Sequence, residues 1–97
     1  MPLLRFEWDD AKESRNRRKH RVSFQEALTV FTDDRALFME DPDHSVEEER
    51  FLLLGLSSTL KKLVVSYCYR EREEVIRIIT ARRANSRERA LYQRGWK

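Results

Sequence analysis

The sequence predicts an α+β fold in which a mostly antiparallel sheet carries helices on one face, in the order β-α-α-β-β-β-β-α. Four strand-like segments follow one another along the chain, whereas an α/β fold would alternate them with helices. Two helix starts lie close together near the beginning. The 97 residues suit a single domain, 1–97, and two glycines and two prolines leave little room for long irregular loops.

The first strand and the first helix are predicted from alternation and from capping chemistry. Residues 4–8 alternate in a strand-like, aromatic pattern. Asp9 or Asp10 then caps a helix that runs to about His20 and is polar on all sides. One side of this helix forms a cationic stripe at three- and four-residue spacing, made of Lys12, Arg15, Arg18 and Lys19.

The second helix begins with a capping box, in which Ser23 is the cap and Glu26 follows three residues later. Val22 and Ala27 are spaced as a hydrophobic staple across this start. An apolar stripe of helical period marks the side that faces the core, namely Phe24, Ala27, Leu28 and Phe31. The polar residues 32–34 end the helix.

The remaining strands are short apolar or β-branched runs separated by turn residues. They are predicted at 35–41, 50–57, 62–69 and 75–81. Residues 41–45 form a turn cluster, and 70–74 form a charged hairpin turn without glycine. A last helix is capped by Asn85 or Ser86 and ends before Gly95.

Charge is distributed unevenly along the chain and predicts an anionic partner. Residues 1–56 carry 9 Lys/Arg and 13 Asp/Glu, whereas residues 57–97 carry 11 Lys/Arg and 4 Asp/Glu, within a net charge of +3. The single cysteine, Cys68, excludes an intramolecular disulfide, and no signal peptide or membrane-spanning run is visible. We therefore expect a cytoplasmic protein without a membrane partner.

The residue types favour phosphate chemistry without a metal or another cofactor. His20, His44 and Cys68 lack the spacing of metal ligands, and the acidic residues 41–49 are better explained as a solvated loop. Arg, Lys, His, Tyr and Glu remain. These are the groups needed to cleave RNA through its own 2′-hydroxyl: a base, cations for the charged transition state, and an acid.

Several of these residues also have structural explanations. Lys19 and His20 could simply be the basic end of a helix, where cations favour the macrodipole. Arg77 lies among β-branched apolar residues, so its head requires an exposed face, an acidic partner or a ligand, and we favour a ligand or partner. Tyr67 could pack in the sheet, and Glu49 could pair with Arg50 or across strands.

Six linked motifs resemble the BrnT family of bacterial type II toxins and cover nearly the whole chain in the same order. They lie at residues 6–9 (FEWD), 19–24 (KHRVSF), 41–45 (DPDHS), 48–51 (EERF), 55–57 (GLS) and 76–82 (IRIITAR). Position 21 is arginine where the family often has glycine. The resemblance implies a RelE-like fold and a ribonuclease that inhibits translation. It also implies a BrnA-type antitoxin with a ribbon-helix-helix part, and contact with operator DNA only through the complex with that antitoxin.

The resemblance, together with the charge pattern, gives two sets of candidate residues. The catalytic set is Lys19, His20, Glu49, Arg50, Arg77 and Arg82. The RNA-binding set is Lys12, Arg15, Arg18, His44, Tyr67 and Arg83. The sequence does not assign the acid and the base. One alternative is a non-catalytic nucleic-acid-binding or operon-regulating module, because basic charge supports binding and catalysis equally. Another is a purely structural partner that offers a sheet edge.

Overall fold

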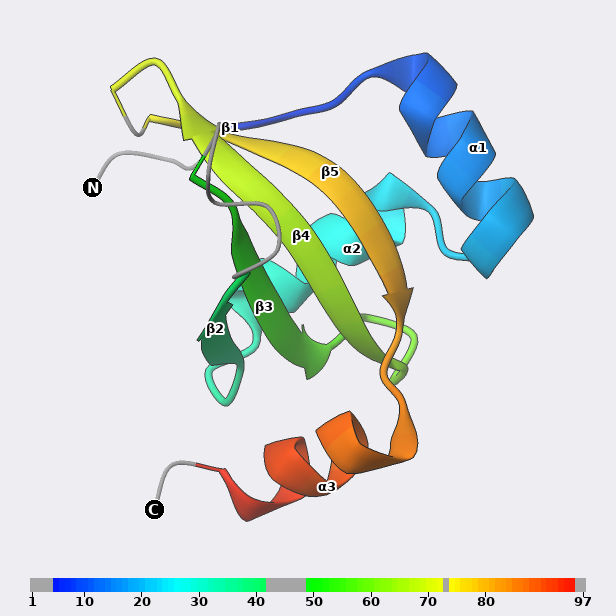
Figure 1. Ribbon diagram of the computed structural model, residues 1–97, viewed down its shortest axis with the longest axis vertical. Coiled ribbons are helices and arrows are strands. Elements are labelled where there is room, and N and C mark those ends of the chain that lie inside the picture. Colours follow the sequence, from blue (N-terminus) through cyan, green and yellow to red (C-terminus); the bar gives the residue numbers. More distant parts are fainter. Residues whose placement is uncertain (1–4, 42–48, 73, 96–97) are drawn as a thin grey trace.

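A five-stranded sheet forms the centre of the computed structural model, which describes residues 5–41, 49–72 and 74–95 (Figure 1). Its strands lie in the order β1-β5-β4-β3-β2, with parallel pairing only between β1 and β5. Their bounds are β1 (Arg5–Glu7), β2 (Leu37–Glu40), β3 (Phe51–Leu56), β4 (Lys62–Arg70) and β5 (Val75–Arg83). The predicted α+β class, the order of elements and the mostly antiparallel sheet are confirmed.

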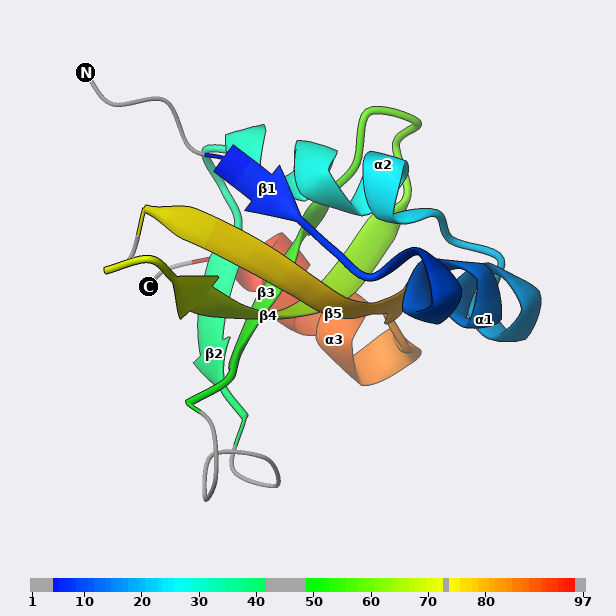
Figure 2. The same ribbon diagram turned by 90° about the horizontal axis from the view of Figure 1, so that it is seen from above.

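The helices lie on both faces of the sheet and at its edge. They are α1 (Asp10–His20), α2 (Phe24–Leu28), the short 3-10 helix η1 (Thr29–Thr32) and α3 (Ser86–Arg94). Figure 2 shows α2 and α3 on opposite faces, with α1 beside β5. The prediction that the helices share one face is therefore wrong. None of the helices in the described ranges is long and apolar enough to cross a membrane.

The sheet has two apolar faces because β4 is apolar at successive positions. Leu63 and Val65 pack against the face covered by α2, together with Phe24. Val64 points the other way and joins a second cluster with Tyr92 of α3. A strand with apolar side chains at successive positions has an apolar surface on both faces of the sheet, so a helix can pack on each face.

Local capping chemistry fixes the helix ends. The Asp9 side chain accepts a hydrogen bond from the Lys12 backbone at 3.0 Å, and Asn85 forms a complete capping box with Glu88. Ser23 caps α2 as predicted, but the second half of its capping box is wrong. The Glu26 carboxylate turns away and accepts hydrogen bonds from side chains of the β3–β4 loop.

A bulge in β5 decides which side chains share a face. Tyr67 is opposite Ile78 and Ser66 is opposite Thr80, so Ile79 has no counterpart on β4. Strict alternation would place Arg77 and Arg82, five residues apart, on opposite faces. The inserted residue resets the alternation and puts both arginines on the face that also carries Thr80.

Candidate functional site

Five of the predicted site residues converge at one pocket between α1, β5 and the start of β3. It has a volume of about 390 Å³, and we call it the basic groove. Its lining residues are Lys12, Arg15, Asn16, Lys19, His20, Arg50, Ile79 and Thr80. Segments from residues 12–20, 50 and 79–80 therefore build a single site. A pocket with this many cationic side chains is suited to a polyanion.

The position of α1 depends on the buried side chain of Asn16. Its amide nitrogen donates to the Val22 carbonyl at 3.0 Å and to the Ala81 carbonyl at 2.8 Å, and its oxygen accepts from the Ala81 backbone N–H at 3.1 Å. The registered pairing of β1 with β5 ends at Arg77, so Ala81 lies beyond it. The Asn16 side chain thus makes the hydrogen bonds that a neighbouring strand would make to Ala81, and it fixes α1, with Lys12, Arg15 and Lys19, at the groove.

The electrostatic setting of His20 favours its neutral form. Partial burial lowers the pKa of His20 below its ordinary value, and the positive charges of Lys19 and Arg82 lower it further. The imidazole therefore has an unprotonated nitrogen at neutral pH. Such a group, placed beside cations, can accept a proton from a bound hydroxyl.

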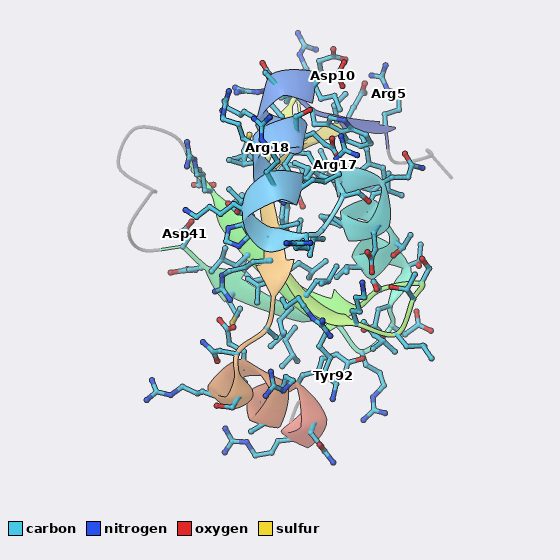
Figure 3. All side chains as sticks on the ribbon, turned by 90° about the vertical axis from the view of Figure 1, so that its right-hand side faces the viewer. Arg5, Asp10, Arg17, Arg18, Asp41 and Tyr92 are labelled. Carbon is cyan, nitrogen blue, oxygen red and sulfur yellow. The ribbon has the colours of Figure 1, made fainter. Side chains whose placement is uncertain are left out.

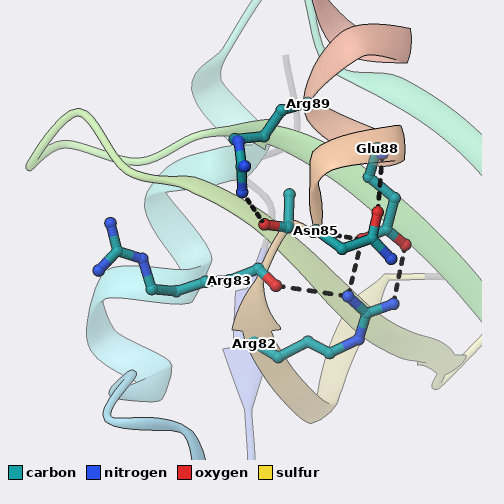
Figure 4. Close-up of polar contacts among 6 residues, drawn as sticks. Arg82, Arg83, Asn85, Glu88 and Arg89 are labelled. Carbon is teal, nitrogen blue, oxygen red and sulfur yellow. Dashed lines mark hydrogen bonds and ion pairs between the residues drawn. The ribbon is translucent and has the colours of Figure 1, made fainter.

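Arg82 is held beside the groove by a bidentate ion pair (Figure 4). Its two terminal nitrogens donate to the two oxygens of Glu88, at 2.8 and 2.9 Å. This hydrogen bonding lowers the pKa of Glu88 and raises the pKa of Arg82. Glu88 also accepts from the Asn85 backbone N–H at 2.9 Å. Arg82 is not among the lining residues, so it acts on the groove through its charge at His20.

Two other residues of the catalytic set lie apart from the groove lining. Arg77 donates to Glu7 of β1 at 2.5 Å, so the structure gives it an acidic partner within the chain. Glu49 is exposed and lines a different pocket with Tyr69 and Arg70. The sequence favoured a ligand or a partner for Arg77, and Glu7 of β1 is an acidic partner within the chain.

The RNA-binding set is divided. Tyr67 is only 4% exposed and packs against Phe51 on the sheet face opposite Thr80, where burial raises its pKa. We therefore interpret Tyr67 as a packing residue.

The other members of the RNA-binding set also lie apart from the groove or outside the described residues, except Lys12 and Arg15. Arg83 lies near Glu26 and outside the groove lining. Arg18 lines a second pocket on α1. His44 lies outside the described residues.

Three residues of the groove lining were not predicted as site residues: Ile79 and two uncharged polar residues, Asn16 and Thr80. Asn16 had a signal, since it is an uncharged amide in a helix made almost entirely of charged residues. Thr80 had none that alternation could reveal, because the bulge at Ile79 decides its face. Within the described ranges, no three His, Cys, Asp or Glu side chains gather as they would around a metal ion.

Comparison with known proteins agrees with the motifs. Residues 8–88 match the family model described as the ribonuclease toxin BrnT of type II toxin–antitoxin systems. The fold is similar to that of the 1.1 Å crystal structure of the Brucella abortus ribonuclease toxin BrnT. The TM-score is 0.67 at 19% identity, and the match covers 87% of this chain and 100% of that one. No curated protein gives a significant match. The chain belongs to the BrnT family of ribonuclease toxins, and its fold is the RelE-like fold of that family.

Proposed function

We propose that this protein cleaves RNA in the basic groove without a metal ion and so inhibits translation. One observation carries the proposal: Arg50, at the start of β3, lines the same pocket as Lys12, Arg15, Lys19 and His20 of α1. Arginine and lysine can neutralise a phosphate, and a neutral histidine can accept a proton. The site therefore contains the groups that cleavage through the 2′-hydroxyl of RNA requires.

The reaction needs only the RNA and these side chains. His20 takes the proton of the 2′-hydroxyl, the 2′-oxygen bonds to phosphorus, and the bond from phosphorus to the 5′-oxygen breaks. Arg50 and Lys19 stabilise the charge on the phosphate oxygens during this exchange. The lysine ammonium groups are the proton donors available to the leaving 5′-oxygen. The products are a 2′,3′-cyclic phosphate and a 5′-hydroxyl.

Membership of a type II toxin family implies a cognate antitoxin and an RNA substrate. We infer that the antitoxin is of the BrnA type, with a ribbon-helix-helix part, and that its binding blocks RNA from the groove. We also infer that the toxin acts in the cytoplasm and meets operator DNA only through this complex. Adding the antitoxin should stop cleavage of RNA by the purified toxin.

The test is incubation of the purified protein with total RNA in excess EDTA, followed by mapping of the cleaved ends. We expect 2′,3′-cyclic phosphate ends. His20→Asn should slow cleavage roughly 100- to 10,000-fold, the usual contribution of a general base. Lys19→Ala and Arg50→Ala should also lose activity, whereas Arg87→Ala on α3 should cleave like the wild type.

Cleavage that disappears in EDTA would contradict the metal-free mechanism. Tight RNA binding without any cleavage, in EDTA or in a translation extract, would favour the alternative of a non-catalytic binding or operon-regulating module. Circular dichroism of each variant should separate loss of activity from loss of folding.

A further inference from the structure

A second cationic pocket lies on α1, beside the basic groove and separate from it. It has a volume of about 430 Å³ and is lined by Ser14, Arg17, Arg18 and Arg21. Figure 3 shows α1 facing the viewer and labels Arg17 and Arg18 on this helix. None of these four residues lines the groove. The proposed reaction leaves this concentration of arginine unexplained.

The carboxylates nearby do not neutralise this pocket. Glu13 accepts from the Arg17 side chain at 3.1 Å and from the Phe24 backbone N–H at 3.3 Å, so it orients one guanidinium of the three. Arg18 and Arg21 are exposed and have no carboxylate partner within the described residues. Two guanidinium groups and the Ser14 hydroxyl therefore remain as donors toward solvent.

Arg21 occupies a backbone position that suits glycine better. It is the C-cap of α1 with φ 61° and ψ 30°, and its N–H donates to the Arg17 carbonyl at 2.8 Å. A side chain in this left-handed region disfavours folding by roughly a factor of five relative to glycine. The helix dipole does not explain an arginine here, because Arg17, Arg18, Lys19 and His20 already place positive charge in the last turn.

Helical spacing makes cationic residues of the two pockets neighbours on α1. Arg15 lines the groove and Arg18 lines the second pocket, and residues three apart on a helix are neighbours, with Cβ atoms about 5–6 Å apart. The next step of three residues leads to Arg21. A row of cationic side chains that begins at the groove and continues around a helix suits single-stranded RNA, whose phosphate charges repeat along the strand.

We propose that Ser14, Arg17, Arg18 and Arg21 form a second phosphate subsite for the RNA whose reacting phosphate lies in the groove. This inference rests on the proposed function, since it extends the path of the same substrate. The guanidinium groups bind a phosphate of the flanking strand through paired N–H donors. The substrate is therefore a single strand long enough to pass around α1.

Arg21→Gly is a sharp test, because it removes the side chain and relieves the backbone at the same time. The probe is a fluorescein-labelled, 2′-O-methyl 12-nucleotide RNA, which cannot be cleaved through its 2′-position. We expect roughly tenfold weaker binding by fluorescence anisotropy and a salt dependence shallower by about 0.7 for each phosphate that the variant no longer binds. The thermal midpoint should rise, so weaker binding could not be attributed to unfolding.

Two control variants and an acidic peptide as a second probe complete the experiment. Arg21→Lys should recover part of the affinity. Arg87→Ala removes one positive charge from α3 and should bind RNA like the wild type. An equal loss of affinity in Arg87→Ala would mean that only the net charge matters, and it would overturn the subsite. Unchanged RNA binding by Arg21→Gly, with weaker binding of a poly-glutamate peptide, would assign the surface to an acidic protein instead.

The outcomes also separate this inference from the proposed function. A wild type that cleaves RNA but whose binding is indifferent to Arg21 refutes only the second subsite. A wild type that binds through Arg21 but never cleaves refutes only the catalytic proposal.

Discussion

Replacing Asn16 by alanine should loosen the attachment of α1 and destabilise the protein by about 2–3 kcal/mol. Three hydrogen bonds join the Asn16 side chain to the backbones of Val22 and Ala81, two residues that are 0% exposed. Each such bond contributes about 1 kcal/mol, and more where its partner stays buried and unsatisfied. The better helix propensity of alanine returns about 0.6 kcal/mol. The net loss is a large share of a typical stability of about 5–15 kcal/mol.

Urea unfolding followed by circular dichroism measures this loss directly. Ser14→Ala is the matched control on the same helix and should stay within about 0.5 kcal/mol of the wild type. The RNA-cleavage rate of Asn16→Ala should fall even at temperatures where the variant is folded, because Lys12 and Lys19 then lose their fixed position relative to Arg50.

Asn16→Asp separates the hydrogen bonds from the shape of the side chain. Its carboxylate would face the carbonyl oxygens of Val22 and Ala81, so the folded state should raise the pKa of this aspartate above the unfolded value of about 3.9. The folded state then binds the proton more tightly than the unfolded state. Relative to the wild type, the variant should therefore be least stable at neutral pH and recover as the pH falls through the raised pKa.

Two results would refute this reasoning. A loss below about 1 kcal/mol for Asn16→Ala would mean that α1 is held mainly by other contacts. A stability deficit of Asn16→Asp that does not change with pH would mean that the carboxylate does not face the two carbonyl groups.

The other predictions concern the charges at His20 and one close contact in the core. An NMR titration should give a pKa of His20 below 6.5; Lys19→Ala should raise it, and no change would contradict the electrostatic explanation. Glu88→Gln should lower it further, since the charge of Arg82 is then no longer neutralised. Because the fold lowers the pKa of Glu88, the ionised carboxylate stabilises the protein at neutral pH. This contribution should be lost as the pH falls below 4.5, the ordinary pKa of the group. Acid unfolding curves of Glu88→Gln should not show this loss. Gly55→Ala should cost about 1–3 kcal/mol in urea unfolding, because the new Cβ would lie 2.7 Å from a Val30 methyl carbon; an unchanged midpoint would show that the neighbouring helix yields easily.

Features that depend on neighbouring residues were predictable from the sequence. Asp9, Ser23 and Asn85 cap their helices because capping needs only a short polar side chain and the next backbone turn. Helical spacing also brought Lys12, Arg15 and Lys19 of the predicted cationic stripe to the groove, whereas Arg18 lines the second pocket. The half of the capping box that failed involves Glu26, whose alternative partner Ser57 is 31 residues away.

Features that depend on distant pairing were not predictable. Arg77 meets Glu7 across 70 residues of sequence, and only the parallel register of β1 and β5 brings them together. The sheet face on which Thr80 and Arg82 lie depends on a bulge, and no residue in the sequence predicts that bulge. An order of strands followed by a helix does not say which face of the sheet the helix covers. In the structure, α3 covers the second apolar face of β4, where Tyr92 packs with Val64.

The way α1 is seated on β5 also sets when the toxin becomes complete during its synthesis. Asn16 belongs to the first fifth of the chain, but its partner Ala81 is made 65 residues later. Pairing over such separations forms late, because a long segment must be ordered first. A nascent chain that has not yet exposed β5 outside the ribosome therefore has no assembled groove. A copy that ends before β5 lacks Ile79 and Thr80 of the groove lining and also Ala81, the partner of Asn16.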